Sequence, residues 1–263
     1  MASIFITGSA DGLGQLAARR LVALGHDVVL HGRNRDRAQQ ALRAVPGARA
    51  ALEGDLASIE QTRELAVQAN AAGPFQTVIH NAGVYGPDAA PRETVDGLDD
   101  VFAINALAPY LLTALIERPQ RLIYLSSGLH QGGDPDLSDL QGRRRGWSGS
   151  QAYANSKLFD VVLAFAVARL WPRVFSNAVD PGWMPTKMGG RFARGDLEQG
   201  VETQVWLAVS DESGAKVTGR YFYRKRTQAA HRAASDVSVQ DAFLATCEEV
   251  TGVRLAPEAT SRE

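Results

Sequence analysis

The sequence lacks the features that mark disulfide-bonded, nucleic-acid-binding or membrane-spanning proteins. Its 263 residues include one cysteine, Cys247, which cannot form an internal disulfide and fits a reducing cytoplasm. The formal net charge of −1 gives no general electrostatic reason to bind nucleic acid or an anionic membrane. No apolar run is long enough to span a bilayer, and the start of the chain lacks the basic and long apolar regions of a signal peptide. We therefore expect a cytoplasmic protein with no nucleic-acid or membrane partner.

Several catalytic signatures are also absent. The sequence contains no H-E-x-x-H, no G-x-x-x-x-G-K-[ST], no G-x-S-x-G and no set of Cys and His residues with zinc spacing. Metalloprotease, P-loop and serine-hydrolase functions therefore have no support, and no metal site is predicted. The five histidines are scattered and are expected to be structural or solvated, although His130 could touch a substrate.

The chain alternates short β-rich runs with amphipathic stretches. This order predicts a doubly wound α/β fold, with one parallel sheet and helices on both faces, over a single domain of residues 1–263 with a loosely held tail at 255–263. The predicted strands are Ser3–Thr7, Asp27–His31, Arg49–Glu53, Thr77–His80, Arg121–Ser126, Val174–Val179 and Tyr221–Tyr223.

A glycine-rich turn follows the first predicted strand and precedes a predicted helix. It reads Thr7-Gly8-Ser9-Ala10-Asp11-Gly12-Leu13-Gly14. Glycines in this place let the backbone turn tightly and approach a pyrophosphate beside the free N–H groups of the helix. The spacing differs from the common G-x-G-x-x-G, so a purely structural turn is the alternative for this segment alone.

The turn resembles the T-G-x-x-x-G-x-G segment of the short-chain dehydrogenase/reductase family, and other segments resemble that family in the same order. They are Asn81-Ala82-Gly83, Ile104-Asn105-Ala106, Ser126-Ser127, Tyr153-Ala154-Asn155-Ser156-Lys157, and Asp180-Pro181-Gly182 with Thr186. The resemblance covers about residues 3 to 225. It implies a Rossmann fold of about seven strands and an oxidoreductase that transfers a hydride between a nicotinamide cofactor and a carbonyl or secondary alcohol.

The pair Tyr153 and Lys157 has a chemical rationale of its own. Residues four apart on a helix lie on one face and can act on one ligand. A free tyrosine, with a pKa of about 10, is a poor acid or base at neutral pH, and a nearby ammonium would lower that pKa. In isolation the same spacing fits a surface Tyr and Lys on an amphipathic helix.

The resemblance also implies roles for Asn105 and Ser127, which complete a catalytic tetrad with Tyr153 and Lys157. Ser127 would hold the substrate oxygen, whereas Ser126 is the alternative for that role or a structural residue at the strand end. Asn105 would hold a water that relays protons to Lys157, or it could simply be a hydrogen-bonding residue of the core.

Cofactor choice should depend on the end of the second predicted strand. The segment Leu30-His31-Gly32-Arg33-Asn34 has no acidic residue to bind ribose hydroxyls, and Arg33 could pair a 2′-phosphate. NADP(H) is therefore preferred, NAD(H) is possible, and a solvated loop arginine is the alternative. Asp55 and Leu56 resemble the family's adenine contact, although Asp55 could instead cap the next helix.

Tyr153 follows Ser127 by 26 positions, about twice the spacing in most of the family. The insertion at 129–149 resembles one in the retinol-dehydrogenase-like branch. Five large side chains could line an apolar substrate pocket, or could pack the core or a subunit contact: Trp147, Trp183, Met184, Met188 and Phe192.

The helix predicted at 158–170 resembles one that pairs subunits in the family, so a homodimer or homotetramer is expected. The alternative function is a non-catalytic dinucleotide-binding redox sensor or scaffold.

Overall fold

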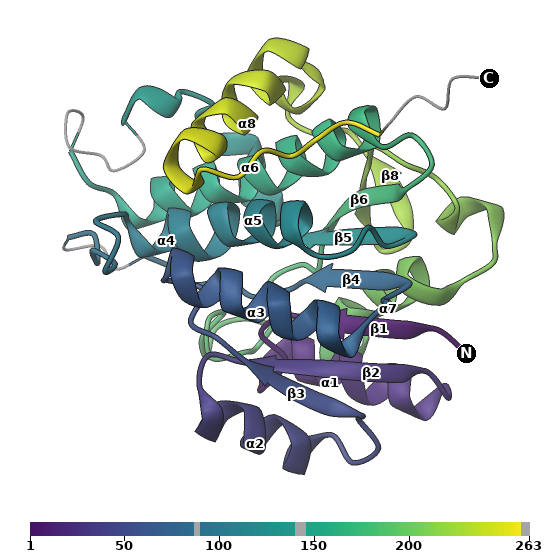
Figure 1. Ribbon diagram of the computed structural model, residues 1–263. Coiled ribbons are helices and arrows are strands. Elements are labelled where there is room, and N and C mark those ends of the chain that lie inside the picture. The colour runs from purple at the N-terminus through teal and green to yellow at the C-terminus, as the bar shows by residue number, and fades with distance from the viewer. Residues whose placement is uncertain (87–89, 140–145, 259–263) are drawn as a thin grey trace.

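The computed structural model describes residues 1–86, 90–139 and 146–258. Eight strands form one sheet in the order β3-β2-β1-β4-β5-β6-β7-β8 (Figure 1). The first seven pair in parallel, and β8 pairs antiparallel to β7. The strands are β1 (Ser3–Ile6), β2 (Asp27–Gly32), β3 (Ala50–Glu53), β4 (Thr77–His80), β5 (Arg121–Leu125), β6 (Phe175–Asp180), β7 (Arg220–Tyr223) and β8 (Arg226–Gln228).

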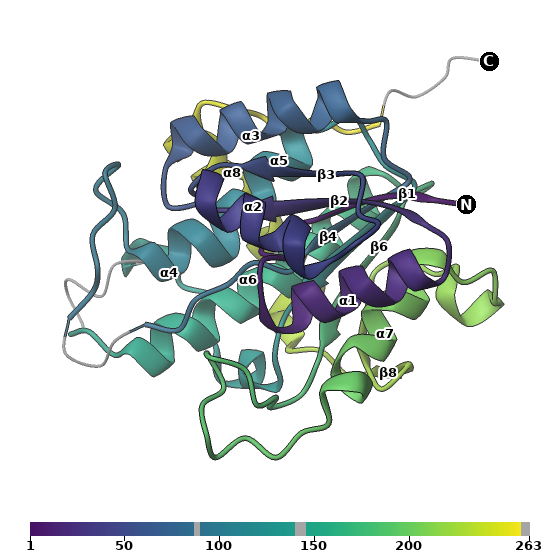
Figure 2. The same cartoon turned by 90° about the horizontal axis from the view of Figure 1, so that it is seen from below.

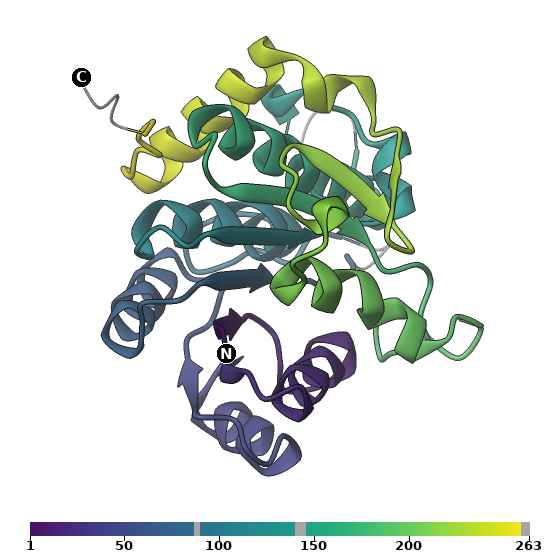
Figure 3. The ribbon, with the colours of Figure 1, turned by 90° about the vertical axis from the view of Figure 1, so that its right-hand side faces the viewer.

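Helices cover both faces of the sheet, as Figures 2 and 3 show from two further sides. One face carries α3, α5 and α6, and the other carries α1 and α7, with α2 beside β2 and β3. The α-helices are α1 (Gly12–Ala23), α2 (Arg35–Ala44), α3 (Ile59–Ala72), α4 (Asp100–Phe102), α5 (Ala108–Leu115), α6 (Gly149–Leu170), α7 (Leu197–Val209) and α8 (Val237–Thr251). A π-helical turn at Ala103–Leu107 joins α4 to α5.

Each central strand is buried on both faces because successive side chains point in opposite directions. In β1, Phe5 packs into the core beneath α3 and α5, whereas Ile4 and Ile6 pack into the core beneath α1 and α7. Val29 and Leu30 of β2 divide in the same way. A near-continuous apolar run is therefore needed in each strand, which explains why these strands were recognisable in the sequence.

The seven predicted strands are confirmed, with each boundary within one residue of the prediction. The eighth strand, β8, was not predicted; it returns from β7 through a two-residue turn. Arg224 and Lys225 occupy that turn with φ angles of 49° and 58°. Such turns usually contain Asn or Gly, so a pair of basic residues gave no hairpin signal.

The helix predicted at 158–170 is the second half of α6, and it is buried within its own chain. Leu158, Val162 and Val167 belong to the same core as Phe243 and Cys247 of α8, and α8 lies over α6 on the outside of the molecule (Figure 1). Self-association through the outer side of α6, as the family resemblance suggested, would have to displace α8.

The expectation of a loose tail from residue 255 is wrong for 255–258. Leu255 is buried, Trp171 Nε1 donates to the Ala256 carbonyl at 2.8 Å, and Glu258 pairs with Arg173 at 2.6 Å. These contacts attach the segment to the end of α6, which explains its order. Residues 259–263 lie outside the described part.

The predicted insertion forms two short 3₁₀ helices, Gly128–Gly132 and Leu137–Asp139, before α6 begins. Residues 140–145 of the insertion lie outside the described residues. Among the helices described, none has the length and apolar character needed to cross a bilayer.

Candidate active site

A pocket of about 570 Å³ opens at the carboxyl ends of the parallel strands. It lies where the strand order reverses between β1 and β4, the position at which doubly wound sheets bind ligands. The structure brings most predicted site residues into its lining: Gly8, Asp11, Gly12, Leu13, Arg33, Asp55, Leu56, Asn81, Ala82, Gly83, Tyr153, Lys157, Pro181 and Thr186.

The glycine turn is attached to the end of β4 by a reciprocal set of hydrogen bonds. Thr7 Oγ1 accepts from the backbone N–H groups of Asn81 and Ala82 at 3.0 and 3.1 Å. Asn81 Nδ2 donates to the carbonyls of Thr7 and Gly8 at 3.0 and 3.1 Å. A Cβ at Gly14 would lie 2.4 Å from Asn81 Nδ2, so this packing requires glycine there.

His31, at the end of β2, supports the same turn and was not identified from the sequence. The Gly8 N–H donates to His31 Nδ1 at 2.9 Å, and His31 Nε2 lies 2.9 Å from the Gly54 carbonyl. This pattern requires the neutral tautomer with the proton on Nε2, in agreement with burial, which lowers the pKa of His31. Ser9 completes the frame, since its Oγ accepts from the His31 N–H at 2.8 Å.

The amino end of α1 fits an anionic ligand. Six other α-helices have an amino-terminal residue whose side chain accepts a backbone N–H: Asn34, Ser58, Asp99, Ser148, Asp196 and Asp236. Within the described residues, Asp11 at the start of α1 makes no such bond. The first N–H groups of α1 therefore face the pocket without a side-chain cap, as a pyrophosphate site requires.

Charged side chains surround this end of the pocket. Asp11 accepts from Arg37 at 2.6 Å and from Lys187 at 2.9 Å. Burial raises the pKa of Asp11, but the bonds from Lys187 and Arg37 outweigh it, so the pKa lies below its ordinary value. Arg33 also lines the pocket and is exposed.

Asp55 lies in the pocket wall and does not cap α3. Its Oδ1 accepts from the Ala57 N–H at 3.0 Å, and Ser58 is the residue that caps the helix. The alternative of a helix-capping role for Asp55 is therefore wrong.

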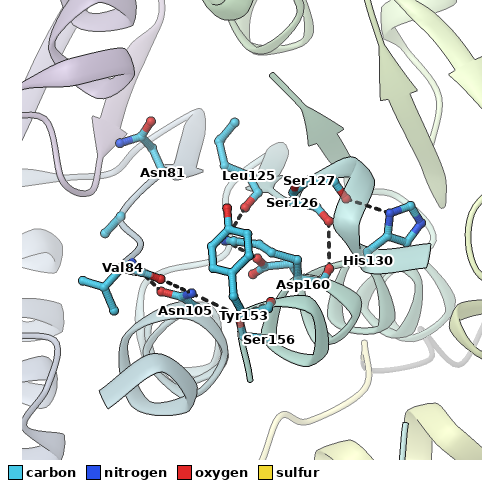
Figure 4. Close-up of polar contacts among 12 residues, drawn as sticks. Asn81, Val84, Asn105, Leu125, Ser126, Ser127, His130, Tyr153, Ser156 and Asp160 are labelled. Carbon is cyan, nitrogen blue, oxygen red and sulfur yellow. Dashed lines mark hydrogen bonds and ion pairs between the residues drawn. The ribbon is translucent and has the colours of Figure 1, made fainter. Parts of the chain in front are cut away.

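Tyr153 and Lys157 lie on one face of α6 at the opposite end of the pocket. Figure 4 shows Tyr153 with its neighbours at the end of β5 and on α6. Lys157 Nζ lies 5.7 Å from the centre of the Tyr153 ring. It donates to the Leu125 carbonyl and to Asp160 Oδ2, each at 2.7 Å. Asp160, one turn further along α6, was not identified from the sequence because a single acidic residue in an apolar helix has no motif.

The electrostatics of Tyr153 differ from the expectation. Burial raises its pKa; Lys157 lowers it, Asp160 raises it, and the balance stays above the ordinary value. The predicted direction of the Lys157 effect is confirmed, but burial outweighs it, so the pKa of Tyr153 is not lowered overall. Burial also raises the pKa of Asp160, to about 7, although Lys157 opposes the shift. For Lys157, burial lowers the pKa, but Asp160 and Tyr153 raise it above its ordinary value.

The two serines at the end of β5 occupy different environments. Ser126 is buried, and its Oγ donates to the Lys157 carbonyl at 2.7 Å, so it attaches α6 to the sheet. The Ser127 side chain lies near enough to Tyr153 to lower the pKa of that phenol, and its Oγ accepts from the Leu129 N–H at 3.2 Å. Ser127 is therefore the serine placed beside the phenol.

Asn105 lies in the π-helical turn and holds the segment after β4. Its side chain exchanges hydrogen bonds with the Val84 backbone at 2.8 and 2.9 Å and donates to Ser156 Oγ at 3.0 Å. These bonds occupy the Asn105 side chain. A water that relays protons to Lys157 would therefore have to bind the Asn105 backbone. π-helical turns inside α-helices are frequent at functional sites, because they alter the regular hydrogen-bond ladder.

His130 is fully buried, so the suggestion that it touches a substrate is wrong. Its Nδ1 lies 2.8 Å from the Ser127 carbonyl, and its Nε2 accepts from the His231 N–H at 3.2 Å. The ring therefore connects the loop of Ser127 to the segment before α8.

The large apolar residues near the site divide into two groups. Met184 is buried against Gly195 and Gly200. Trp183 and Phe192 are exposed, at 65% and 69%, on the loop that follows β6. Tyr85 packs against Tyr153, with ring centres 4.9 Å apart.

The remaining predicted positions frame the pocket. A Cβ added at Gly12 would lie 3.6 Å from Thr186 Cγ2, so the loop after β6 adjoins the glycine turn. Gly182 has a φ angle of +85° and donates its N–H to Asp180 Oδ1 at 2.7 Å. The site thus combines a pyrophosphate-type turn, a Tyr/Lys pair and a serine beside the phenol, which together define a nicotinamide-dependent oxidoreductase.

Comparison with known proteins agrees with this geometry. Residues 2–197 match the family model described as short chain dehydrogenase, so the chain belongs to that family. It is an oxidoreductase whose family binds NAD(P)(H) and interconverts alcohols and carbonyls. Its relatives place it in the retinol-dehydrogenase-like branch.

Two curated relatives illustrate this. An uncharacterized oxidoreductase of Emericella nidulans is 46% identical over 96% of this chain and 98% of its own length. Retinol dehydrogenase 14 of Mus musculus is 29% identical over 84% of this chain and 77% of its own length.

Two solved structures share the fold. A protein from Mycobacterium paratuberculosis superposes with a TM-score of 0.83 and 26% identity, over 97% of this chain and 95% of that one. A blue fluorescent protein from a metagenomic library, in complex with NADPH, superposes with a TM-score of 0.67 and 26% identity, over 84% of this chain and 95% of that one.

Proposed function

We propose that this protein transfers a hydride between NADP(H) and the carbonyl or secondary alcohol of a small, apolar substrate, with Tyr153 as general acid and base. The observation that carries the proposal is the Tyr153/Lys157 pair, with Lys157 Nζ 5.7 Å from the Tyr153 ring centre, at one end of a pocket whose other end is the uncapped amino terminus of α1. One continuous cavity would thus hold a dinucleotide and expose its reactive end to an acid.

Each side chain has a defined task in this proposal. The bound nicotinamide supplies or accepts the hydride. Ser127 orients the substrate oxygen, and in reduction Tyr153 gives that oxygen its proton. Lys157 holds the nicotinamide ribose and stabilises the phenolate, while Asn105 supports the path by which Tyr153 is reprotonated.

The preference for NADP(H) rests on Arg33. The other arginine at this end of the pocket, Arg37, is already paired with Asp11. Arg33 has no ion-pair partner among the described residues and lines the pocket, so its guanidinium is available for a 2′-phosphate. The similar blue fluorescent protein was solved with NADPH, which supports the same choice.

The apolar substrate is supported by the surroundings of Tyr153. Tyr85 packs on its ring, and Met188 lines the pocket from the loop after β6. Side chains of this kind bind a substrate by burying apolar surface while Ser127 fixes its one polar atom.

A substrate screen with both cofactors tests the proposal. We expect NADPH to be consumed with apolar ketones or aldehydes, and Tyr153→Phe to lower kcat by about 10²-fold to 10⁴-fold with nearly unchanged NADPH affinity. Fluorescence of bound NADPH measures that affinity. A protein that binds NADPH but turns over no carbonyl substrate would instead support the sensor or scaffold.

Cytoplasmic location and self-association as a homodimer or homotetramer belong to the same proposal. Because α8 covers α6, we place a subunit contact on another surface. Sedimentation of the purified protein measures the oligomeric state, and a monomer at all concentrations would contradict this part.

A further inference from the structure

The Lys157 ammonium has three donors, and the structure commits two of them. One is directed to the Leu125 carbonyl at the end of β5 and one to Asp160 Oδ2, each at 2.7 Å. On another side, Nζ approaches Gly83, where an added Cβ would lie 3.6 Å away. Since Gly83 and Lys157 both line the pocket, the third donor is left for the pocket.

Asp160 differs from the other acidic partners near the pocket because it is buried together with its lysine. The side chains of Lys157 and Asp160 are 5% and 2% exposed. Their spacing along α6 builds the pair into one helical turn. In such a poorly screened place, a carboxylate strongly offsets the field of the adjacent ammonium. When both groups are ionised, Tyr153 faces a nearly neutral pair instead of a full positive charge.

We propose that Asp160 is a positioning residue for the reaction: it holds the Lys157 ammonium at the end of β5 and offsets its charge, so that Tyr153 stays in the protonated form that delivers a proton to a carbonyl. The inference rests on the proposed function, in which Tyr153 is the acid. It adds the direction of the reaction to that proposed function, since it assigns the site to carbonyl reduction at neutral pH.

The titratable groups around the pair agree with this assignment. Asp160 acts on Tyr153 and also on Tyr124 of β5, and it raises the pKa of both phenols. Asp180 of β6 raises the pKa of Tyr153 as well, whereas Lys157 lowers it. Because the pKa of Asp160 is itself about 7, its protonation below neutrality leaves the ammonium uncompensated.

The two reaction directions need opposite forms of the phenol. Reduction requires the phenol, which gives up its proton, and oxidation requires the phenolate, which takes one. A group that keeps Tyr153 protonated therefore extends the pH range of reduction upward. The same group shifts the onset of oxidation to alkaline pH, because the phenolate forms only there.

Asp160→Asn tests the proposal because the amide keeps the size and one oxygen acceptor but removes the charge. We expect the alkaline limb of the reduction profile and the rising limb of the oxidation profile both to move to lower pH, by about one unit. The matched control is Asp241→Asn, the same chemical change in the surface ion pair with Arg169. Its profiles should coincide with those of the wild type.

A second measurement does not depend on turnover. Phenolate absorbance of the wild type minus that of Tyr153→Phe isolates the titration of Tyr153. The same difference, taken in the Asp160→Asn background, should appear at lower pH. If the wild type reduces no substrate but this shift occurs, the proposed function fails and the inference about Asp160 stands.

The proposal is overturned if Asp160→Asn folds and leaves both the pH profiles and the Tyr153 titration unchanged. If Asp160→Asn does not fold, the wild type is labelled with isotopes at aspartate carboxyl and tyrosine ring carbons for NMR. One aspartate should then titrate near neutral pH, and the Tyr153 signal, assigned by Tyr153→Phe, should respond over the same range. The proposal is also overturned if the Tyr153 signal does not change over the pH range in which that aspartate titrates.

Discussion

The two ends of the pocket each contain an aspartate paired with a basic side chain, but the pairs differ in burial. At the phosphate end, Asp11 is 42% exposed and contacts Arg37 and Lys187 from two other segments. At the other end, Asp160 is 2% exposed and contacts Lys157 on its own helix. Water screens the first pair and hardly reaches the second, so similar groups have different effects.

The difference appears in the pKa values. Asp11 has a lowered pKa because the bonds from Lys187 and Arg37 outweigh its partial burial. Asp160 has a pKa raised to about 7 because complete burial outweighs Lys157. The exposed pair can exchange partners when a charged ligand arrives, whereas the buried pair keeps its partners and acts directly on Tyr153.

The largest contrast between the two ends should appear in stability. Asp160→Leu leaves the Lys157 ammonium buried without its carboxylate, which typically costs about 3–5 kcal/mol. Asp11→Leu removes only a partly exposed pair and should cost about 1 kcal/mol or less. Urea denaturation of the two variants measures both values. Equal losses would show that burial does not distinguish the pairs.

The next effect concerns cofactor choice at the exposed end. Arg33→Asp should lower the preference for NADPH over NADH by roughly tenfold or more, because a charge-assisted bond to the 2′-phosphate is replaced by repulsion. Arg35→Asp is the matched control, since it makes the same charge change at an exposed position outside the pocket lining. The ratio of kcat/KM for the two cofactors is the measurement. An unchanged ratio in Arg33→Asp would remove this residue from its role.

The two aspartates should also affect stability over different pH ranges. For Asp160, the folded-state pKa of about 7 exceeds the ordinary 3.8, so its contribution is full below 3.8 and is lost as pH rises to about 7. For Asp11, the folded-state pKa is below 3.8, so its contribution is present above that value and is lost as pH falls.

Urea midpoints at a series of pH values check these signs. From about pH 4 to 7, the wild type should lose stability relative to Asp160→Asn while its difference from Asp11→Asn stays nearly constant. Below about pH 4, the wild type should lose stability relative to Asp11→Asn. Parallel curves for the two variants would contradict the assignment.

The smallest effect should come from the link between the glycine turn and the loop after β6. Lys187 is 80% exposed, so Lys187→Ala should cost well under about 1 kcal/mol. High salt should abolish that cost by screening the pair. Thermal unfolding at low and high salt checks this, and a large loss that persists in salt would mean that Lys187 packs as well as pairs.

Local patterns made much of the fold and site predictable. The apolar runs of β1, β2 and β4 mark a buried parallel sheet, since each strand is covered on both faces. The glycine spacing and the Tyr153–Lys157 interval depend only on neighbours in the chain. β8 was missed because its turn uses Arg224 and Lys225, whose backbone angles follow from pairing with β7 and not from residue preference.

Other features of the site had no local signal. His31 and Asn81 hold the glycine turn from the ends of two other strands, and neither bond can be inferred from one segment. His130 was considered for substrate contact, but the segment before α8 buries it.

The sequence by itself determined the succession of strands and helices of an α/β fold, the dinucleotide turn and the pair of residues proposed to move a proton. These depend on spacing of 2, 3 or 4 residues, which local backbone geometry converts directly into shared faces. Tertiary structure decided how acidic that pair is, because the pKa of Tyr153 depends on burial and on the ionised neighbours that folding encloses with it. It also decided that α8 covers the outer side of α6, since only packing of the complete chain determines which apolar faces meet.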